Sequence, residues 1–554
     1  MASETKSIAV LDASELKSGQ MKEVEFGEGK VLVSRIGDKV HATSAWCTHY
    51  GAPLAKGVLE ASGRVTCPWH GACFNVCTGD IEDAPALSSL HSFKAEISSE
   101  GKIVVTAPLD KVTKKDMERS SLPVEISVEA AKESKGVVIV GGGSGAIHTI
   151  ESLRENGYNK PITMISKEPH APIDRTKLSK VLTTDPAKIE WRSADVLKEK
   201  YGVTLRTSTE VASVSPKDHT VTLTTGEVIK YEELVLSPGS TPRRIPIPGA
   251  KEGELEGVFT LRGIKDAQAI SAAVTPGKRL VVIGSSFIGM ELVVAVAKKE
   301  LESIEVIGMD EVPFENILGK EVGAGIMKFH ESKEIIFHMK SKTVSINPSS
   351  HDSKCVGSVT LEGPDGDTKE VPADIVILGV GVGPATSFLK DSGIPLEKDG
   401  GVKVDGFLRV EGAEGVFAIG DIAHFPQQTG ELKRIEHWNV AGNHGRAVGR
   451  TIARPGEAIS FAKIPVFWSA QGQQLRYCGV GAGFDDVIVQ GKPEELKFVA
   501  YYVKGDKVTA VASMQKDPIV IKSSELLRLG MMPTASEIRE GKSPLDVDIT
   551  GVTN

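Results

Sequence analysis

The chain has 554 residues, 40% of them apolar and 25% charged, with a formal net charge of −8 at pH 7. A chain of this length does not fold around one core, so three or four domains are expected. The acidic balance argues against a general nucleic-acid binder, which would present a basic face, and no nucleic-acid partner is expected. Only six cysteines are present, which excludes a disulfide scaffold and favours a reducing compartment. No run of about eighteen apolar residues occurs, so no membrane span is expected.

The first hundred residues have the pattern of an all-β domain, which we place at residues 1–107. Short alternating segments, such as residues 31–35 and 102–106, are separated by turn residues. Residues 108–134 are rich in Lys, Asp, Glu and Ser, and this composition predicts a linker.

Two short motifs in this domain, C-T-H and C-P-W-H, each combine a cysteine with a histidine. Cys47 and His49 belong to the first motif, and Cys67 and His70 to the second. Two thiolates and two imidazoles are the ligands of a Rieske [2Fe–2S] centre, where the cysteines bind one iron and the histidines the other. A Cys₂His₂ zinc site needs the same residue types, but zinc fingers usually pair cysteine with cysteine and histidine with histidine. The mixed pairs, each followed by a glycine, therefore favour the Rieske centre over zinc.

From residue 136 the sequence changes to an α/β pattern with two similar units. An apolar strand at residues 137–140 leads into a glycine turn and a helix expected at residues 147–156. A second apolar strand, at residues 279–283, leads in the same way into a helix expected from residue 290 to about 299. Two such units fit one nucleotide-binding domain inserted into another. The expected bounds are 135–262 with 384–460 for the first domain, 263–383 for the second, and 461–554 for a small β-rich C-terminal domain.

The first glycine turn has the features of a dinucleotide site. Gly141 permits the tight turn, Gly143 lets the backbone approach a pyrophosphate, and Ala146 allows close helix–strand packing. The N-terminus of the following helix offers unpaired N–H groups to a phosphate. Glu168, after the next strand, is placed to accept hydrogen bonds from a ribose.

The second glycine turn departs from the pattern. Ser286 stands where the middle glycine is normally found. The next strand ends in Gly308, where an acid selective for the NAD ribose would normally stand, and Asp310 or Glu311 could substitute. The missing acid weakens discrimination against a 2′-phosphate, so NADH is favoured only slightly over NADPH. The residues expected to contact the nicotinamide nucleotide are Gly284, Ser286, Ile288, Gly289, Asp310 and Gly381.

With these motifs in view, the chain resembles the apoptosis-inducing-factor-like flavoproteins that carry an N-terminal Rieske domain, relatives of the ferredoxin and rubredoxin reductases. The resemblance covers nearly the whole chain and includes D-R-T-K-L-S-K at residues 174–180 and F-W-S at residues 467–469. It also includes L-S-P-G-S-T-P-R at residues 236–243 and F-A-I-G-D at residues 417–421. The implied fold is an all-β Rieske domain, two Rossmann-like doubly wound domains for FAD and NAD(P)H, and a small α+β reductase domain.

The resemblance also implies roles for single residues. Lys180 would lie near the flavin N5, and Glu291 would pair with it across the flavin and the nicotinamide, which would stack near Phe287. A helix beginning near residue 436 would direct its positive end towards the flavin pyrimidine. The other residues expected to contact FAD are Arg175, Val211, Arg262, Asp421, Glu436, His437, Trp438 and Trp468.

No cysteine lies between Cys77 and Cys355, so the FAD domain lacks the redox pair of disulfide reductases. The cluster is then the expected acceptor, and the flavin must split the two electrons of a hydride because the cluster takes one. We therefore expect an FAD-dependent NAD(P)H oxidoreductase that passes electrons through FAD to the [2Fe–2S] cluster and on to an external acceptor, either a small redox protein or a small molecule.

Two alternatives to this function stay open. A Rieske-type oxygenase would need a further iron held by two histidines and a carboxylate, for which His437 and His444 are candidates. A redox-sensing, apoptosis-related flavoprotein would show little turnover. The start of the chain has no presequence-like pattern, so a cytoplasmic location is expected, with the mitochondrion as the alternative that the resemblance implies.

Overall fold

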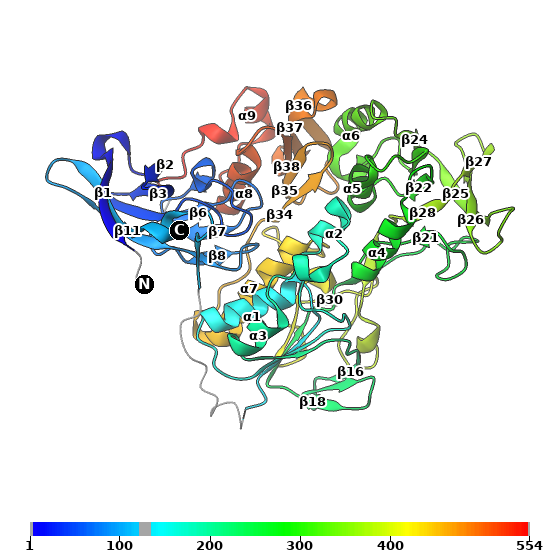
Figure 1. The fold of residues 1–554 in the computed structure, drawn as a ribbon, viewed down its shortest axis with the longest axis horizontal. Coiled ribbons are helices and arrows are strands. Elements are labelled where there is room, and N and C mark those ends of the chain that lie inside the picture. Colours follow the sequence, from blue (N-terminus) through cyan, green and yellow to red (C-terminus); the bar gives the residue numbers. More distant parts are fainter. Residues whose placement is uncertain (1–3, 121–133, 552–554) are drawn as a thin grey trace.

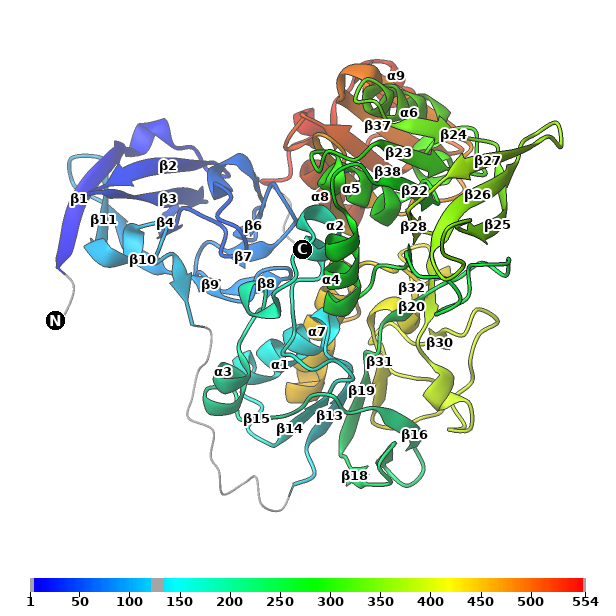
Figure 2. The ribbon, with the colours of Figure 1, turned by 45° about the vertical axis from the view of Figure 1, so that its right-hand side comes forward.

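The computed structural model describes residues 4–120 and 134–551, and no helix in this part of the chain is long and apolar enough to cross a membrane. Figure 1 shows the N-terminal β domain, in blue, beside a larger body that contains the two α/β units and the C-terminal domain. Figure 2 shows the same division from a second direction.

The N-terminal domain is built on a six-stranded antiparallel sheet. Its strands alternate between core and solvent, as in β11, where Ile103, Val105 and Ala107 are fully buried and their neighbours are not. In spatial order the strands are β1 (Thr5–Asp12), β11 (Lys102–Pro108), β10 (Ser92–Ile97), β4 (Lys39–Ser44), β3 (Gly29–Ile36) and β2 (Met21–Phe26).

A second, smaller antiparallel sheet of the same domain carries the C-P-W-H motif. The motif lies between two of its strands, while the C-T-H motif follows β4. The order is β5 (Val58–Leu59), β6 (Arg64–Thr66), β7 (Cys73–Asn75) and β8 (Ile81–Asp83). Of the expected linker, residues 121–133 lie outside the described residues. Before them, β12 (Glu118–Arg119) pairs with β9 (Ser89–Leu90).

The first α/β unit contains a five-stranded parallel sheet. All four residues of its central strand, Val137–Val140, are buried, as expected for a parallel strand covered on both faces. The order is β15 (Val203–Arg206), β14 (Ile162–Ile165), β13 (Val137–Val140), β19 (Glu233–Leu236) and β31 (Val416–Ala418). Helices α1 (Ser144–Glu155) and α7 (Trp438–Ala453) pack against each other (Figure 2). Smaller elements are α2 (Thr176–Val181), α3 (Ala194–Glu199), β16 (Val211–Ser215), β17 (Thr220–Leu223), β18 (Val228–Lys230), β30 (Val402–Lys403), β32 (Ala423–Pro426) and β33 (Leu432–Lys433).

The second α/β unit repeats this design. Its parallel sheet has the order β21 (Val258–Phe259), β28 (Ile375–Leu378), β22 (Arg279–Ile283), β23 (Ser303–Ile307) and β24 (Ile336–His338). Its helices are α4 (Ile264–Ala273), α5 (Phe287–Val296) and α6 (Glu315–Glu331). A three-stranded sheet of β25 (Lys342–Pro348), β26 (Val356–Glu362) and β27 (Thr368–Pro372) follows, and β20 (Ser240–Pro242) pairs with β29 (Val382–Pro384) at the crossing between the units.

The C-terminal domain is an antiparallel sheet with two helices. The order is β34 (Val466–Ala470), β35 (Gln474–Gly479), β38 (Lys507–Met514), β37 (Lys497–Lys504) and β36 (Asp486–Lys492). Helix α8 (Ile519–Leu529) packs against β35 and β38, and α9 (Ala535–Arg539) follows it. Strands β37 and β38 are consecutive in the chain and pair as a hairpin.

The fold class predicted from the sequence is confirmed, but both motif helices begin earlier than predicted. Helix α1 begins at Ser144 rather than residue 147, and α5 begins at Phe287 rather than residue 290. The reason is that each helix starts inside its turn, with Gly143 or Ser286 as the residue before the first turn of helix.

Candidate functional site

The two Cys–His motifs form loops with the same backbone hydrogen bonds. In each loop the cysteine N–H donates to the carbonyl of an alanine five residues on (2.8 Å in both), and a glycine N–H donates back to the cysteine carbonyl. Those glycines, Gly51 and Gly71, both have a φ of +71°, which favours a residue without a Cβ. The glycine after each motif therefore closes the loop that presents the ligands.

The four side chains of these loops meet in the domain interior. The Nδ1 atoms of His49 and His70 lie 3.3 Å apart, and the thiols of Cys47 and Cys67, each 1% exposed, are hydrogen-bonded to each other. Among the described residues, no three His, Cys, Asp or Glu side chains are arranged to hold one metal ion, as a zinc site requires. The two sulfur atoms lie together and the two imidazole nitrogens lie together, which is the arrangement of a Rieske cluster, where two cysteines bind one iron and two histidines the other. The residues present therefore fit a [2Fe–2S] group better than a single zinc ion.

The surroundings of His49, His70 and Cys67 favour the protonation states that bind metal, whereas those of Cys47 favour the protonated thiol. Burial lowers the pKa of His49 to about 3 and that of His70 well below its usual value, so both rings are neutral near pH 7. Burial raises the pKa of the Cys47 thiol. Burial also opposes ionisation of Cys67, yet a hydrogen bond from Cys47 and the backbone N–H groups of Trp69 and His70 lower the Cys67 pKa overall. Neutral imidazole and thiolate are the forms that bind metal.

The first glycine turn, between β13 and α1, has the shape that a pyrophosphate needs. A Cβ at Gly141 would lie 1.9 Å from the carbonyl oxygen of Ser237, whereas one at Gly143 would meet no atom of the structure within 4 Å. Ala146 is fully buried where the helix meets the sheet. No side chain of the described residues caps α1, so its first N–H groups are free to bind an anion.

A chain of charged contacts runs from this turn towards the second unit. Arg175 forms an ion pair with Glu168 and donates from Nη1 to the Arg262 carbonyl at 3.0 Å. Arg262 in turn donates to Asp421 at 3.1 Å, and the Ser240 hydroxyl donates to the same carboxylate. The structure thus brings together four of the residues expected to contact FAD. Val211, the first residue of β16, lies in the core of the same unit.

Lys180 and Glu291 meet where the two α/β units face each other. Lys180 Nζ lies 3.0 Å from Glu291 Oε2, and both side chains are nearly buried, at 12% and 6% exposed. The hydroxyl of Ser179 donates to Oε2 and that of Ser469 to Oε1 at 2.7 Å. Three donors therefore hold this carboxylate in one orientation.

The second glycine turn, between β22 and α5, contains Gly284 and Ser286, and Ile288 and Gly289 follow in the first turn of α5. Phe287 begins the helix and packs against Phe314 and Phe467, with ring centres 5.0 and 5.1 Å away. Ile288 is 45% exposed. In the described residues no side chain caps this helix either, so both turns present free N–H groups.

The end of β23, where an acid selective for the NAD ribose was expected, has a glycine in crowded surroundings. A Cβ at Gly308 would lie 2.5 Å from Met339 Cε, so the site has little room for an acid. Met309 is 78% exposed, and Asp310 accepts a hydrogen bond from Asn316 at 3.1 Å. The position beside Gly381 is open, since a Cβ there would meet no atom within 4 Å.

The iron-ligand loops and the Lys180–Glu291 pair are joined by an aromatic ring. The ring centre of Trp468 lies 5.3 Å from that of His70, and Lys180 Nζ lies 4.8 Å from the same tryptophan ring. On the other histidine, the His49 ring centre lies 5.6 Å from Trp191 and 5.8 Å from Trp438. The rings of His49 and His70 thus face the first α/β unit and the C-terminal domain rather than solvent.

Helix α7 begins at Trp438, close to the predicted position. His437 caps it, accepting from the Asn439 N–H at 3.2 Å, and burial lowers the His437 pKa to about 3. Glu436 forms an ion pair with Arg434. His444 lies further along the same helix and accepts from the Gly420 N–H at 3.2 Å.

Comparison with known proteins agrees with this architecture. The Rieske [2Fe-2S] domain family matches residues 6–94, the pyridine nucleotide-disulphide oxidoreductase family residues 135–445, and the reductase C-terminal family residues 466–546. Apoptosis-inducing factor 3 of Homo sapiens is 39% identical over 527 residues, covering 94% of this chain and 84% of its own. The chain belongs to the apoptosis-inducing-factor-like group of the pyridine nucleotide-disulphide oxidoreductase family. It is a flavoprotein with an added Rieske domain, and its cofactors are FAD, a [2Fe–2S] cluster and NAD(P)H.

More distant relatives lack part of this chain. Rhodocoxin reductase of Rhodococcus erythropolis is 29% identical and covers 69% of this chain and 86% of its own. A ferredoxin reductase from Rhodopseudomonas palustris has a TM-score of 0.67 at 28% identity, covering 73% of this chain and 97% of its own. The covalent putidaredoxin reductase–putidaredoxin complex has a TM-score of 0.67 at 25% identity, and the match covers 74% of this chain and 95% of the chain in that structure.

Several residues of the site were not found by sequence reasoning. Trp191 and the pair Tyr50–Asp174, whose hydroxyl and carboxylate are hydrogen-bonded, lie against the ligand loops. Ser179 and Ser469 orient Glu291. These contacts join segments far apart in the sequence, and no local pattern marks them.

Proposed function

We propose that this protein oxidises NAD(P)H and passes the electrons through FAD to its own Rieske cluster, from which an external acceptor takes them one at a time. When bound, FAD accepts a hydride and can release electrons singly, which the nicotinamide cannot do. The observation that carries the proposal is Trp468, whose ring touches both His70 and Lys180. A cluster ligand and the proposed flavin-site lysine thus share one neighbour.

Lys180 and Glu291 are proposed to set the electrostatics at the flavin and nicotinamide. A positive charge on Lys180 favours negative charge arriving beside it, and the nearly buried position strengthens this effect. Glu291 balances the lysine in the resting state, held by Ser179 and Ser469. Burial keeps water from the pair, so the lysine stays fixed where charge develops.

The two glycine turns and their helices are proposed to bind the two pyrophosphates. Free N–H groups at the start of α1 and α5 favour an anion at each position. Arg175 and Arg262 lie beside the first turn and add positive charge there. Phe287, at the start of α5, is placed to orient the nicotinamide near Lys180.

The Rieske domain is proposed to replace a separate electron-transfer partner. The more distant relatives named above are reductases, and one was captured covalently attached to putidaredoxin, a second protein. In the present chain an iron–sulfur domain is already docked with its histidines against Trp438 and Trp468. The external acceptor is then a small redox protein or small molecule that meets the chain after the cluster.

Substitution of Cys67 by serine tests this order of transfer. NADH should bleach the flavin of C67S at the wild-type rate, because the hydride step does not involve the cluster. The EPR signal of the reduced cluster should be lost, and cytochrome c reduction should fall at least tenfold. C355S is the matched control, because Cys355 is a free, partly exposed thiol in the second α/β unit. Cytochrome c reduction by C67S at the full rate contradicts the proposal.

A second function, redox sensing with little turnover, is favoured by the name of the relatives that are 39% and 38% identical, apoptosis-inducing factor 3 of Homo sapiens and Mus musculus. Steady-state kinetics separate the two. A long-lived charge-transfer complex with slow turnover supports sensing, and rapid turnover supports the reductase.

For the location, we propose the cytoplasm, with the mitochondrion as the alternative. All six cysteines lie in the described residues and none forms a disulfide, which fits a reducing compartment. Fractionation of cells with antibody detection distinguishes the two compartments.

A further inference from the structure

The second iron-ligand loop, residues 67–71, is held by three side chains that do not belong to the Rieske domain. Arg476 Nε donates to the carbonyl of Pro68 at 3.2 Å, Asn439 Nδ2 to that of His70 at 3.1 Å, and Lys463 Nζ to that of Gly71 at 3.2 Å. The three donors come from β35, from the first turn of α7 and from the segment before β34. Three of the loop's five backbone carbonyls therefore accept a hydrogen bond from the rest of the chain.

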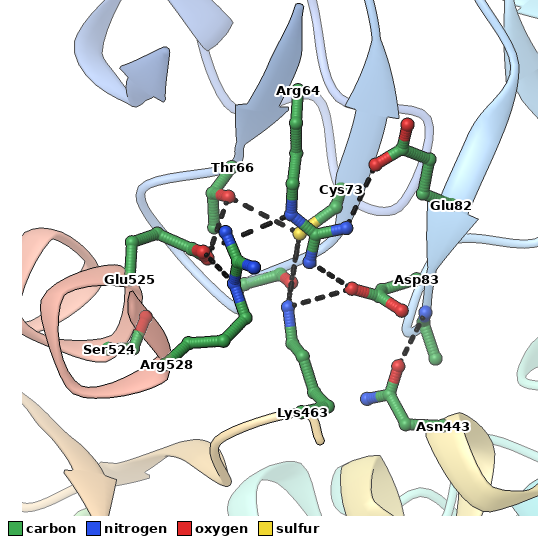
Figure 3. A network of polar contacts seen from close by, with 12 residues as sticks. Arg64, Thr66, Cys73, Glu82, Asp83, Asn443, Lys463, Ser524, Glu525 and Arg528 are labelled. Atoms are coloured by element: carbon green, nitrogen blue, oxygen red, sulfur yellow. Dashed lines mark hydrogen bonds and ion pairs between the residues drawn. The ribbon is translucent and has the colours of Figure 1, made fainter. Parts of the chain in front are cut away.

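The three side chains are buried and fixed by further contacts. Asn439 is 3% exposed and also donates to the Val466 carbonyl at 3.0 Å. The Lys463 side chain is 8% exposed and lies 3.1 Å from Asp83 and 3.0 Å from the sulfur of Cys73, as Figure 3 shows. The Arg476 side chain is 4% exposed and lies 3.2 Å from Asp517. Such contacts leave each donor little freedom to turn away from the loop.

The first ligand loop, residues 47–51, has a different environment. Thr48 donates to the Ser88 carbonyl at 2.6 Å, within the Rieske domain itself. Among the described residues, no side chain from residues 134–551 donates a hydrogen bond to a backbone carbonyl of this loop. The first loop contacts the reductase part through a side chain, since the Tyr50 hydroxyl donates to Asp174. The asymmetry therefore concerns the backbone carbonyls, which accept hydrogen bonds from the reductase part in the second loop.

A wider network of charges surrounds the second loop. Arg64 pairs with Glu82 and Asp83, and Arg528 pairs with Glu525 (Figure 3). Arg528 also pairs with Glu60. Thr66, next to the ligand Cys67, donates to Glu525 at 3.0 Å. Carboxylates and cations thus nearly balance, so removing one cation leaves a carboxylate beside the loop without its partner.

We propose that Asn439, Lys463 and Arg476 are positioning residues of the iron–sulfur site, and that the two cations set its redox potential from the reductase side. The inference rests on the proposed function, because it requires the cluster at Cys47, His49, Cys67 and His70. The reduction potential of such a cluster depends on the net charge and hydrogen bonds around it. A nearby positive charge stabilises the electron that arrives, so docking to the reductase makes the cluster a better acceptor.

The test is a redox titration of full-length variants followed by EPR. R476Q and K463M each remove one cation, while R476K and K463R keep it. K497Q is the control, because it removes an exposed cation from the same C-terminal domain. In R476Q and K463M we expect the equilibrium constant for reducing the cluster to fall at least tenfold, a shift of about 59 mV for one electron. R476K, K463R and K497Q should titrate like the wild type.

Substitution of Asn439 distinguishes the effect of positioning the loop from the effect of charge. N439L removes the donor to the His70 carbonyl without changing the charge, so the iron content and the shape of the EPR signal should change more than the potential. Loss of the cluster from R476Q and K463M, with retention in R476K and K463R, also supports the proposal.

Wild-type potentials in cluster-loaded R476Q and K463M overturn the inference. If wild-type protein itself shows no [2Fe–2S] signal, the proposed function fails instead, so the two failures are distinguishable.

Discussion

The first glycine turn permits a test that separates folding from FAD binding, because its two glycines meet different surroundings. A Cβ at Gly141 would lie 1.9 Å from the Ser237 carbonyl oxygen, although real Cβ atoms essentially never approach closer than 3.0 Å. The backbone would have to move by more than 1 Å, yet it is held by the hydrogen bond from the Ser237 N–H to the Val140 carbonyl at 2.8 Å. Gly141 also has a φ of +124°. We expect G141A to lower the free energy of unfolding by ~3 kcal/mol or more.

For Gly143 we expect the opposite result, with little change in stability and weaker FAD binding. Its φ of −102° suits alanine, and a Cβ would meet no atom within 4 Å. Alanine is a poorer helix cap than glycine, but it also lowers the entropy of the unfolded chain, so G143A should change stability by less than ~0.5 kcal/mol. In our proposal the open space holds the FAD pyrophosphate, so the same methyl group should weaken FAD binding at least tenfold, or ~1.4 kcal/mol.

The assay compares both variants without and with FAD. Denaturant unfolding of the FAD-free proteins gives stability, and quenching of flavin fluorescence during titration gives affinity. G143A that binds FAD as tightly as the wild type, or that is as unstable as G141A, refutes the reasoning.

Three other predictions follow from the site. W468L should slow transfer from flavin to cluster at least tenfold in stopped-flow experiments and leave the cluster's EPR signal intact, and an unchanged transfer rate contradicts the proposed route. Burial lowers the pKa of His444 to about 3 in the native protein. Between pH 6.5 and 3, His444 therefore binds a proton in the unfolded chain but stays neutral in the native protein. Stability from this residue is complete above about pH 6.5 and falls by ~1.4 kcal/mol per pH unit below it. H444F should flatten that slope in urea unfolding at several pH values, and an unaltered slope assigns the acid sensitivity to other groups. G308E combined with M339A and S285A, which remove the two side chains that a Cβ at position 308 would meet, should raise the ratio of kcat/KM for NADH over NADPH at least tenfold. A ratio equal to that of M339A with S285A alone contradicts the assignment of this strand end to the ribose.

The sequence by itself determined the chemistry of the two centres, because the residues concerned are close together along the chain. Cys47 with His49 and Cys67 with His70 occupy short loops whose glycines fix the turn, and each strand, glycine turn and helix is a local unit. Local spacing and hydrophobic pattern were therefore enough to predict the Rieske domain and the two nucleotide folds, and the family resemblance completed the fold class, whereas the individual iron ligands stay a prediction. Both motif helices begin earlier than predicted, since a glycine turn and the first turn of the helix after it share residues.

Only the tertiary structure decided how these centres are joined. Trp468 touches His70, and Asn439, Lys463 and Arg476 bind the second ligand loop, across separations of 369 to 408 residues in the hydrogen bonds concerned. Such contacts depend on how whole domains pack, and neither residue spacing nor propensity carries information about that packing. The sequence therefore specified two redox centres, whereas their juxtaposition follows from the surfaces that the folded domains present to each other.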